Sequence, residues 1–200
     1  MKKRIVSCLI ICAVLVLSFF YSHIEDNTCV YSEDADISTY ISTGTLSGDE
    51  ELTQAFVAQE ESIDGIRLKV DLLGNVENVI LHYTLLDESL NELYKGTVPA
   101  TELENQEFNV LKTSKISNAS GKKYVLVLSE ENSDLQNGVS FHLTPGRPDG
   151  EDLMIKGNST DAALVVEFIC NRFDLETYVV LIGMITFIAV FMKVLYKMFK

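Results

Sequence analysis

Two long stretches without a formal charge, one near each end of the chain, constrain the fold most strongly. The first runs from Ile5 to Ile24, and the second runs from Tyr178 to Met192, or to Tyr196 if Lys193 is included. At the helical rise of about 1.5 Å per residue, the first stretch spans roughly 30 Å and the longer form of the second spans roughly 28 Å. A lysine near the end of a span can place its ammonium at the membrane interface. We therefore expect two transmembrane helices, one within residues 1–24 and one within residues 177–197.

Basic residues at the outer tip of each stretch predict the orientation of the chain. These membrane-flanking residues are Lys2, Lys3, Arg4, Lys193, Lys197 and Lys200. Cytoplasmic flanks of membrane spans carry an excess of Lys and Arg. We therefore expect two spans in the plasma membrane, with both termini in the cytoplasm and residues 198–200 as a basic cytoplasmic tip. Residues from about 25 to 176 would then lie outside the membrane.

The first stretch has a competing interpretation as a cleaved signal peptide. Its apolar run exceeds the usual signal-peptide core of about 7–15 residues, and no A-x-A-like cleavage site follows it. The best available site, Val16-Leu17-Ser18, lies inside the apolar run. We expect an uncleaved signal anchor, and cleavage stays an open alternative. A lipoprotein is excluded because the apolar run follows Cys8 instead of preceding it. A C-terminal sortase sorting signal is excluded because no LPxTG-like pentapeptide precedes Tyr178.

The central region is strongly acidic. All 29 Asp and Glu residues lie between Glu25 and Glu176, together with only ten of the 16 Lys and Arg residues, which gives a formal net charge of −19. A domain of this charge repels phosphate backbones, so a nucleic-acid partner is excluded. The length of 200 residues is enough for one domain plus its anchors.

Two kinds of pattern divide the central region. Residues 25–49 are rich in Ser, Thr, Asp, Glu and Gly, and we interpret them as an acidic linker, either an extended stalk or an arm lying on the domain. Residues 50–173 contain eight or nine short apolar runs, many with period-two alternation as in residues 66–72, separated by turn signals such as Gly74-Asn75. This pattern predicts an all-β fold, an antiparallel β-sandwich or jelly roll, flanked by the two transmembrane helices.

Two of the four cysteines lie at matching distances from the expected spans. Cys29 follows Tyr21 by about eight residues, and Cys170 precedes Tyr178 by about eight. Both would be tethered to the same membrane face at a similar height. We therefore predict a disulfide between Cys29 and Cys170 that clamps the base of the domain in an oxidising compartment. The alternative is two reduced, partly buried thiols.

Four short pieces of sequence carry a resemblance to a known family. They are Leu52-Thr53-Gln54-Ala55-Phe56, Ile63-Asp64-Gly65-Ile66, the paired strands ending Leu85-Leu86-Asp87, and Ser120-Gly121-Lys122-Lys123-Tyr124. Their order resembles the extracytoplasmic β-sandwich domain of membrane-embedded cell-surface polysaccharide proteins of Gram-positive bacteria. The resemblance implies a jelly-roll-like domain of the carbohydrate-binding type. In that family the domain is often attached to many spans, whereas two are expected here, and no functional residues are carried over.

The chain shows no catalytic, cofactor or metal signature. Three histidines occur, one at the membrane boundary and two on expected strands, where packed or surface roles are usual: His23, His82 and His142. There is no G-x-S-x-G framework and no His/Cys ligand spacing. The loop 149–152 is acidic but lacks the spacing of a calcium loop. We therefore expect no catalytic residues, no cofactor and no metal.

Three functions remain after these exclusions. We expect an accessory or interaction module of the cell envelope without chemistry of its own, which contacts the bilayer and binds another membrane protein or a cell-wall polysaccharide. A carbohydrate-binding module is the alternative, and an exposed aromatic platform would favour it. A glycan-active enzyme is a remote alternative that would use paired carboxylates facing each other across a cleft. The adjacent acidic pairs are Glu60-Glu61, Glu130-Glu131 and Glu151-Asp152. The chain has no Trp, and Tyr31 and Tyr40 are expected to be exposed in the linker.

Overall fold

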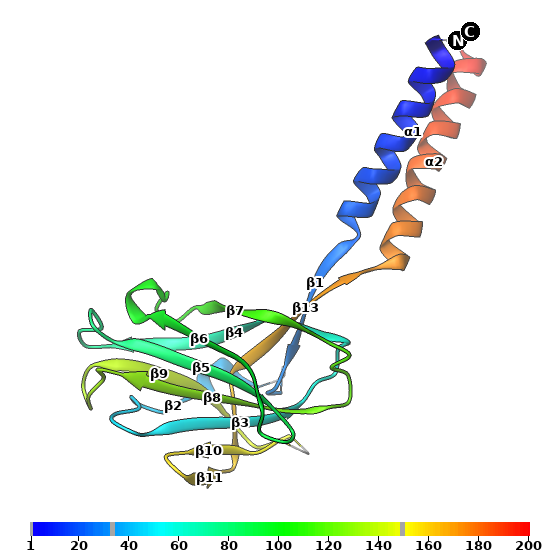
Figure 1. Ribbon diagram of the computed structural model, residues 1–200. Helices are drawn as coiled ribbons and strands as arrows, with labels where there is room; N and C mark the ends of the chain where they lie inside the picture. The colour runs from blue at the N-terminus through cyan, green and yellow to red at the C-terminus, as the bar shows by residue number, and fades with distance from the viewer. Residues whose placement is uncertain (1, 33–34, 149–150) are drawn as a thin grey trace. The chain divides into compact units, whose positions relative to one another are not determined.

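The computed structural model describes residues 2–32, 35–148 and 151–200, with side chains from Leu9 onward (Figure 1). The chain divides into two compact units. One contains Met1–Asp26 and Asn171–Lys200, and the other contains Asn27–Cys170. We call them the helical unit and the β unit.

The helical unit contains two long helices that lie side by side, α1 (Lys2–Tyr21) and α2 (Leu175–Met198) (Figure 1). Asp174 is the N-cap of α2, because its carboxylate accepts a hydrogen bond from the backbone N–H of Glu176. The backbone N–H of Asp174 in turn donates to the carbonyl of Ser22 at 2.8 Å, and the Phe19 and Phe173 rings lie 5.2 Å apart. These contacts fix the end of α1 against the start of α2.

One helix among the described residues, α2, is long and apolar enough to cross a membrane by length and composition. Its most apolar segment has a mean hydropathy of 2.4, and no part of that segment is buried within the chain. The described apolar part of α1, Leu9–Tyr21, is shorter. The structure therefore supports one candidate span, and the second span rests on the sequence.

The β unit is built from two antiparallel sheets (Figure 1). Among the described residues, sheet 1 has the order β1-β13-β4-β9-β12, with β7 also paired to β4 and β2 also paired to β9. Its strands are β1 (His23–Cys29), β2 (Ile41–Ser42), β4 (Ser62–Leu73), β7 (Phe108–Ser117), β9 (Gly138–Pro145), β12 (Ala162–Leu164) and β13 (Val166–Phe173). Sheet 2 has the order β11-β10-β3-β8-β5-β6. Its strands are β3 (Glu51–Val57), β5 (Ile80–Asp87), β6 (Glu92–Pro99), β8 (Lys123–Glu131), β10 (Leu153–Ile155) and β11 (Asn158–Thr160). Two short 3-10 helices, η1 (Ile37–Thr39) and η2 (Ala100–Glu102), lie in the connections.

The two sheets share one apolar core, as the period-two pattern requires. On β4, Ile66, Leu68 and Val70 are fully buried, whereas the alternating side chains of Arg67 and Lys69 lie on the other face. Side chains from both sheets belong to the same cluster of buried residues. The rings of Phe56 on β3 and Phe168 on β13 stack across it with centroids 3.8 Å apart. The expected antiparallel β architecture is confirmed.

The segment interpreted as a linker, residues 25–49, differs from an extended stalk. It carries β1, η1 and β2, and from Asn27 onward it belongs to the β unit. Val30 and Leu46 are buried in the core, and the N–H of Val30 donates to the carbonyl of Val166 at 3.2 Å. The N–H of Thr43 donates to the carbonyl of Phe141 at 3.0 Å. These long-range pairings make the segment an arm that adds short strands to sheet 1. The polar composition of the segment gave no indication of these pairings.

Candidate functional site

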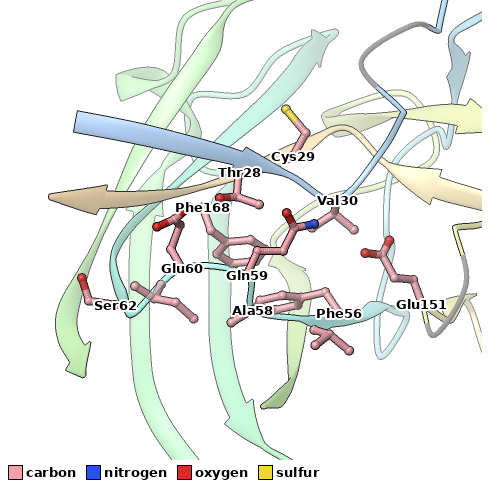
Figure 2. Close-up of a pocket in the computed structure, with 12 residues that line it drawn as sticks. Thr28, Cys29, Val30, Phe56, Ala58, Gln59, Glu60, Ser62, Glu151 and Phe168 are labelled. Carbon is pink, nitrogen blue, oxygen red and sulfur yellow. The ribbon is translucent and has the colours of Figure 1, made fainter. Parts of the chain in front are cut away.

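A small cavity lies where β1 meets the end of β3 (Figure 2). It has a volume of about 10 Å³. Its lining includes Glu60 and Glu151, which come from two of the three acidic pairs singled out in the sequence. A volume of this size holds about one water molecule and excludes a sugar ring. The cavity therefore brings two carboxylates near one space without forming a substrate cleft.

Glu151 is the more unusual of these two carboxylates. Burial raises the pKa of its side chain to about 7. Its Oε2 atom is buried and has no hydrogen-bond partner among the described residues. Glu151 belongs to the acidic loop 149–152, which lacks the spacing of a calcium loop. Residues 149–150 lie outside the described residues. Asp152 forms an ion pair with Arg147 at 2.8 Å.

A larger groove of about 440 Å³ lies at one end of sheet 2 and is lined by acidic and hydroxyl-bearing residues. Its lining is Gly48, Asp49, Glu51, His82, Ser129, Glu130, Glu131, Asn132 and Ser133. The Nε2 atom of His82 lies 3.2 Å from Oε2 of Glu131. No group of three or more His, Cys, Asp or Glu suited to a metal ion occurs within the part of the chain that the structure describes. The groove is an acidic surface without a defined ligand set.

Glu130, which also lines this groove, has a structural role. Its carboxylate is 5% exposed and accepts hydrogen bonds from the backbone N–H groups of Leu46 and Val139, each at 2.8 Å. Burial raises the pKa of the Glu130 carboxyl, and these two hydrogen bonds and the charge of Lys156 partly offset that rise. Glu130 therefore joins β8 of sheet 2 to the arm and to β9 of sheet 1.

The outer face of sheet 1 carries a cluster of aromatic rings and cations, which we call the Lys69 patch. It consists of Tyr31, Tyr40, Arg67, Lys69, Phe108 and His142, and each of these residues is partly exposed. Arg67 and Lys69 lie on β4, Phe108 on β7 and His142 on β9, whereas the two tyrosines come from the arm. The period-two alternation of β4 places its two cations on this face because its apolar residues fill the core.

Arg67 is anchored by a buried carboxylate. Its Nη1 atom lies 2.7 Å from Oε2 of Glu167, which is opposite it on β13 and only 8% exposed. The hydroxyl of Tyr31 donates to the other carboxylate oxygen of Glu167 at 3.3 Å. The Arg67 guanidinium also lies 5.2 Å from the centroid of the Phe108 ring. The positive charge of Arg67 is therefore locally neutralised and its position is fixed.

Lys69 lies between two aromatic rings. Its Nζ atom is 5.7 Å from the ring centroid of Tyr40 and also 5.7 Å from that of Phe108, both within the range of a cation–π contact. The Tyr40 ring lies 6.4 Å from the Tyr31 ring and 6.1 Å from the His142 ring. Burial raises the pKa of both tyrosine hydroxyls, so they remain protonated at neutral pH. The patch combines ring faces, hydroxyls and a positive charge on one surface.

Cys29 and Cys170 have different surroundings. Cys170 is a buried free thiol, and its sulfur lies 3.4 Å from the Ser62 hydroxyl. Figure 2 shows the sulfur of Cys29 on the side of β1 away from the cavity. Cys170 has the same strand parity as Phe168, which faces the core, so a bond to Cys29 would require one strand to rotate or shift. The disulfide between Cys29 and Cys170 stays a prediction.

The basic residues expected to flank the membrane lie within or beside the two helices. Lys2, Lys3 and Arg4 begin α1, and their side chains lie outside the described residues. Lys193 lines a largely apolar groove of about 490 Å³ between α1 and α2. The Lys200 ammonium lies 5.6 Å from the centroid of the Tyr196 ring.

The Lys69 patch was not predicted from the sequence. The alternation of β4 indicated that Arg67 and Lys69 face away from the core, but nothing local showed which rings would meet them. Tyr31 and Tyr40 were expected to be exposed in a linker, whereas the arm carries them to sheet 1. Of the histidines for which packed or surface roles were expected, His142 belongs to the patch, and its Nε2 atom lies 3.2 Å from Asp71. The Nδ1 atom of His23 lies 2.9 Å from the Phe19 carbonyl oxygen.

Comparisons with known proteins give no family. No protein-family model matches the chain, and no curated protein matches it. Among solved structures, the crystal structure of the infectious bursal disease virus VP2 subviral particle aligns over 74% of this chain and 40% of that chain, with 12% sequence identity and a TM-score of 0.29. The chain thus spans less than half the length of that protein, and a likeness at this TM-score carries no argument about fold or function.

Proposed function

We propose that this chain is a membrane-anchored accessory or interaction module of the cell envelope, with no chemistry of its own. The observation that carries the proposal is α2, whose most apolar segment has no residue buried within the chain. Such a helix needs a hydrocarbon environment for its side chains. Attached to it is a β unit whose described cavities offer no enclosed substrate site. Anchoring plus display of a surface is the function that these two features support.

The proposal includes a second span and a defined topology. In it, α1 is an uncleaved signal anchor that pairs with α2, both termini are cytoplasmic and the β unit is extracytoplasmic in the plasma membrane. The support is the helical course of α1 from Lys2 to Tyr21, its packing beside α2, and the basic residues at both tips.

Impermeant thiol labelling of intact cells tests this topology. In a background without the native cysteines, Ser120→Cys lies in an exposed turn of the β unit and is expected to react in intact cells. Lys200→Cys is the matched control at the opposite end and is expected to react only after permeabilisation. Protection of Ser120→Cys in intact cells would show that the proposed orientation is wrong.

The partner of the module is proposed to be another membrane protein or a cell-wall polysaccharide. A photo-reactive residue at Val110, which is 60% exposed on the same face of sheet 1 as Lys69, is expected to form an adduct in living cells. The same residue at Leu135, which is 81% exposed in a turn, is the control and is expected to form less adduct. Absence of any adduct from Val110 would remove the support for an interaction role of this face.

A carbohydrate-binding module is the second candidate, and the Lys69 patch is the observation that favours it. Sugar-binding domains stack aromatic rings on the apolar faces of sugars. The chain has no Trp, but Tyr31, Tyr40 and Phe108 bring three rings to one partly exposed surface. The resemblance to extracytoplasmic domains of cell-surface polysaccharide proteins favours the same function. An enzymatic role is not proposed, because the cavity shared by Glu60 and Glu151 is about 10 Å³.

A further inference from the structure

We propose that the Lys69 patch, extended by Lys112 on β7, binds an anionic polysaccharide. In this arrangement the sugar rings lie on Tyr40 and Phe108, and the carboxylate or phosphate groups of the polymer meet the ammonium groups of Lys69 and Lys112. The inference deepens the second candidate function and rests on it. It specifies the binding surface, the class of ligand and the residues that determine specificity for that class.

The distribution of positive charge points to this surface. Of the ten Lys and Arg residues between residues 25 and 176, four lie on β4 and β7: Arg67, Lys69, Lys112 and Lys115. Arg67 is paired with Glu167 at 2.7 Å, and Lys115 is paired with Asp64 at 3.1 Å. Neither Lys69 nor Lys112 forms an ion pair within the described ranges 2–32, 35–148 and 151–200. These two ammonium groups are therefore available to an anion.

Lys112 faces the same side of sheet 1 as the patch. On β7, Asn109 and Leu111 are buried, and the alternating residues Phe108, Val110 and Lys112 lie on the other face. In the register of the two strands, Phe108 is opposite Lys69 and Val110 is opposite Arg67. The exposed side chain of Lys112 therefore continues the row of Phe108 and Val110, at a spacing of about 7 Å between alternate residues.

The acidic character of the whole region does not exclude an anionic ligand here. At physiological ionic strength, interactions between exposed charges decay over about 8 Å, so remote carboxylates are largely screened. Charges in direct contact with the ligand then decide the sign of the interaction. Within the patch, the carboxylate of Glu167 is already satisfied by Arg67 and Tyr31. The carboxylate of Asp71, two residues along β4 from Lys69, lies 3.2 Å from Nε2 of His142. Lys69 and Lys112 therefore outnumber this one remaining carboxylate.

The rings add a requirement that a simple anion does not meet. Tyr40 and Phe108 flank the Lys69 ammonium at equal distances, so a ligand that reaches Lys69 passes over a ring face. A sugar supplies an apolar face for the ring and an attached anion for the lysine. A polymer supplies several such units for Lys69 and Lys112 together. This combination distinguishes an anionic polysaccharide from inorganic phosphate and from a neutral glycan.

The test uses the full chain in a neutral detergent, with binding measured by microscale thermophoresis. The probes are oligomers of polygalacturonate, which carries carboxylates, and phosphomannan, which carries phosphates. Dextran is the neutral polysaccharide, and inorganic polyphosphate is the charged polymer without sugar rings. Binding to at least one of the two anionic polysaccharides, with dextran and polyphosphate each at least about tenfold weaker, is the expected result.

Matched variants locate the binding surface. Lys69→Gln and Phe108→Ala are each expected to weaken binding about tenfold, whereas Lys69→Arg keeps the charge and stays within about threefold. Lys95→Gln on β6 of sheet 2 is the control and is expected to leave the affinity unchanged. Tyr40→Phe removes the hydroxyl and keeps the ring. It is expected to leave the affinity unchanged, because the ring of Tyr40 makes the contact with the sugar. Circular dichroism of each variant confirms that the β unit remains folded.

Three outcomes would overturn the inference: no binding to either anionic polysaccharide, equal binding to polyphosphate, or equal effects of Lys69→Gln and Lys95→Gln. None of these outcomes affects the labelling of Ser120→Cys or the adduct from Val110. Failure of the ligand assignment is therefore distinguishable from failure of the proposed anchoring and interaction role.

Discussion

The Oε2 atom of Glu130 lies 2.5 Å from the position that a Cβ atom would take on Gly138. That oxygen accepts the hydrogen bond from the N–H of Val139, and the other carboxylate oxygen accepts from Leu46. A methyl group on residue 138 would therefore displace the carboxylate. The absence of a side chain at Gly138 is what allows Glu130 to join the two sheets and the arm.

Gly138→Ala is expected to lower the free energy of unfolding by about 2 kcal/mol, the cost of losing a buried hydrogen bond to a charged group. The measurement is denaturant unfolding of the full chain in detergent, followed by circular dichroism near 218 nm. The cause is tested by a double-mutant cycle with Glu130→Ala. The Thr45 side chain, whose Cγ2 atom lies 2.8 Å from the same Cβ position, remains in the Glu130→Ala background. If Gly138→Ala costs as much in that background as in the native protein, the contact with Thr45 and not the clash with Glu130 is the reason.

The ionisation of Glu130 predicts a pH dependence. Burial raises the pKa of this carboxyl in the folded protein above its unfolded value of about 4.3. The folded state therefore binds the proton more tightly, and the contribution of this group to stability increases as the pH falls through the folded pKa. It reaches its full value below the unfolded pKa.

The matching experiment compares the native protein with Glu130→Gln between pH 4 and 8. The stability difference is expected to shift in favour of the native protein as the pH is lowered, because the variant lacks this titration. Carboxyls whose pKa is lowered, such as those of Asp87 and Asp134, titrate in both proteins and cancel in the comparison. Glu131→Gln, at a neighbouring residue whose side chain is 57% exposed, is the control. A stability difference that is independent of pH would contradict the assignment.

Local patterns in the sequence were sufficient to predict most of the strands and turns within residues 50–173, but not β1 and β2. The alternation over residues 66–72 lies within β4, and the turn signal Gly74-Asn75 follows the end of that strand. Such signals are local because burial of one strand face sets a period of two. The order of the strands in each sheet depends on contacts between distant residues, which periodicity does not specify.

The strand pairings of the arm and the contacts of the Lys69 patch were beyond local patterns for the same reason. Val30 pairs with Val166, and Tyr40 meets Lys69, only because the backbone of residues 27–49 joins the edge of sheet 1. The polar composition of this segment is typical of a linker, and its few buried side chains, among them Leu46, show no periodicity. Hydrogen bonds of the backbone, which leave no trace in the composition, hold it in place.

The surroundings of Cys170 predict its reactivity. The thiol is 2% exposed beside Ser62, so it is expected to react with maleimide only after unfolding. Mass spectrometry of labelled peptides, with and without prior reduction, measures this in the full chain. Protection that survives reduction is the expected result for a buried thiol. Protection that persists in the unfolded chain and is lost only on reduction, together with a gel mobility shift abolished by Cys29→Ser, would instead establish the disulfide with Cys29.

The pair formed by Arg67 and Glu167 gives the last prediction. Glu167 is 8% exposed, and its carboxylate is held by the Arg67 guanidinium at 2.7 Å and by the Tyr31 hydroxyl at 3.3 Å. Removal of one partner from a buried pair leaves an uncompensated charge, which costs roughly 3–5 kcal/mol when both groups are fully buried. The side chain of Arg67 is 29% exposed, so solvent screening reduces the expected loss.

Arg67→Ala is therefore expected to lower the free energy of unfolding by about 2 kcal/mol, since water reaches part of the site that the guanidinium leaves. Arg67→Ala/Glu167→Ala is expected to recover part of that loss, because no buried carboxylate then remains unpaired. Arg147→Ala, which removes an exposed ion pair with Asp152, is the matched control and is expected to change the stability little, by about 0.5 kcal/mol or less. Denaturant unfolding of the native protein, the three single variants Arg67→Ala, Glu167→Ala and Arg147→Ala, and the double variant measures these differences. A double variant that is less stable than Arg67→Ala by the full cost of Glu167→Ala alone would show that the two residues do not act as a pair, and that the arm is held on sheet 1 by its backbone hydrogen bonds instead.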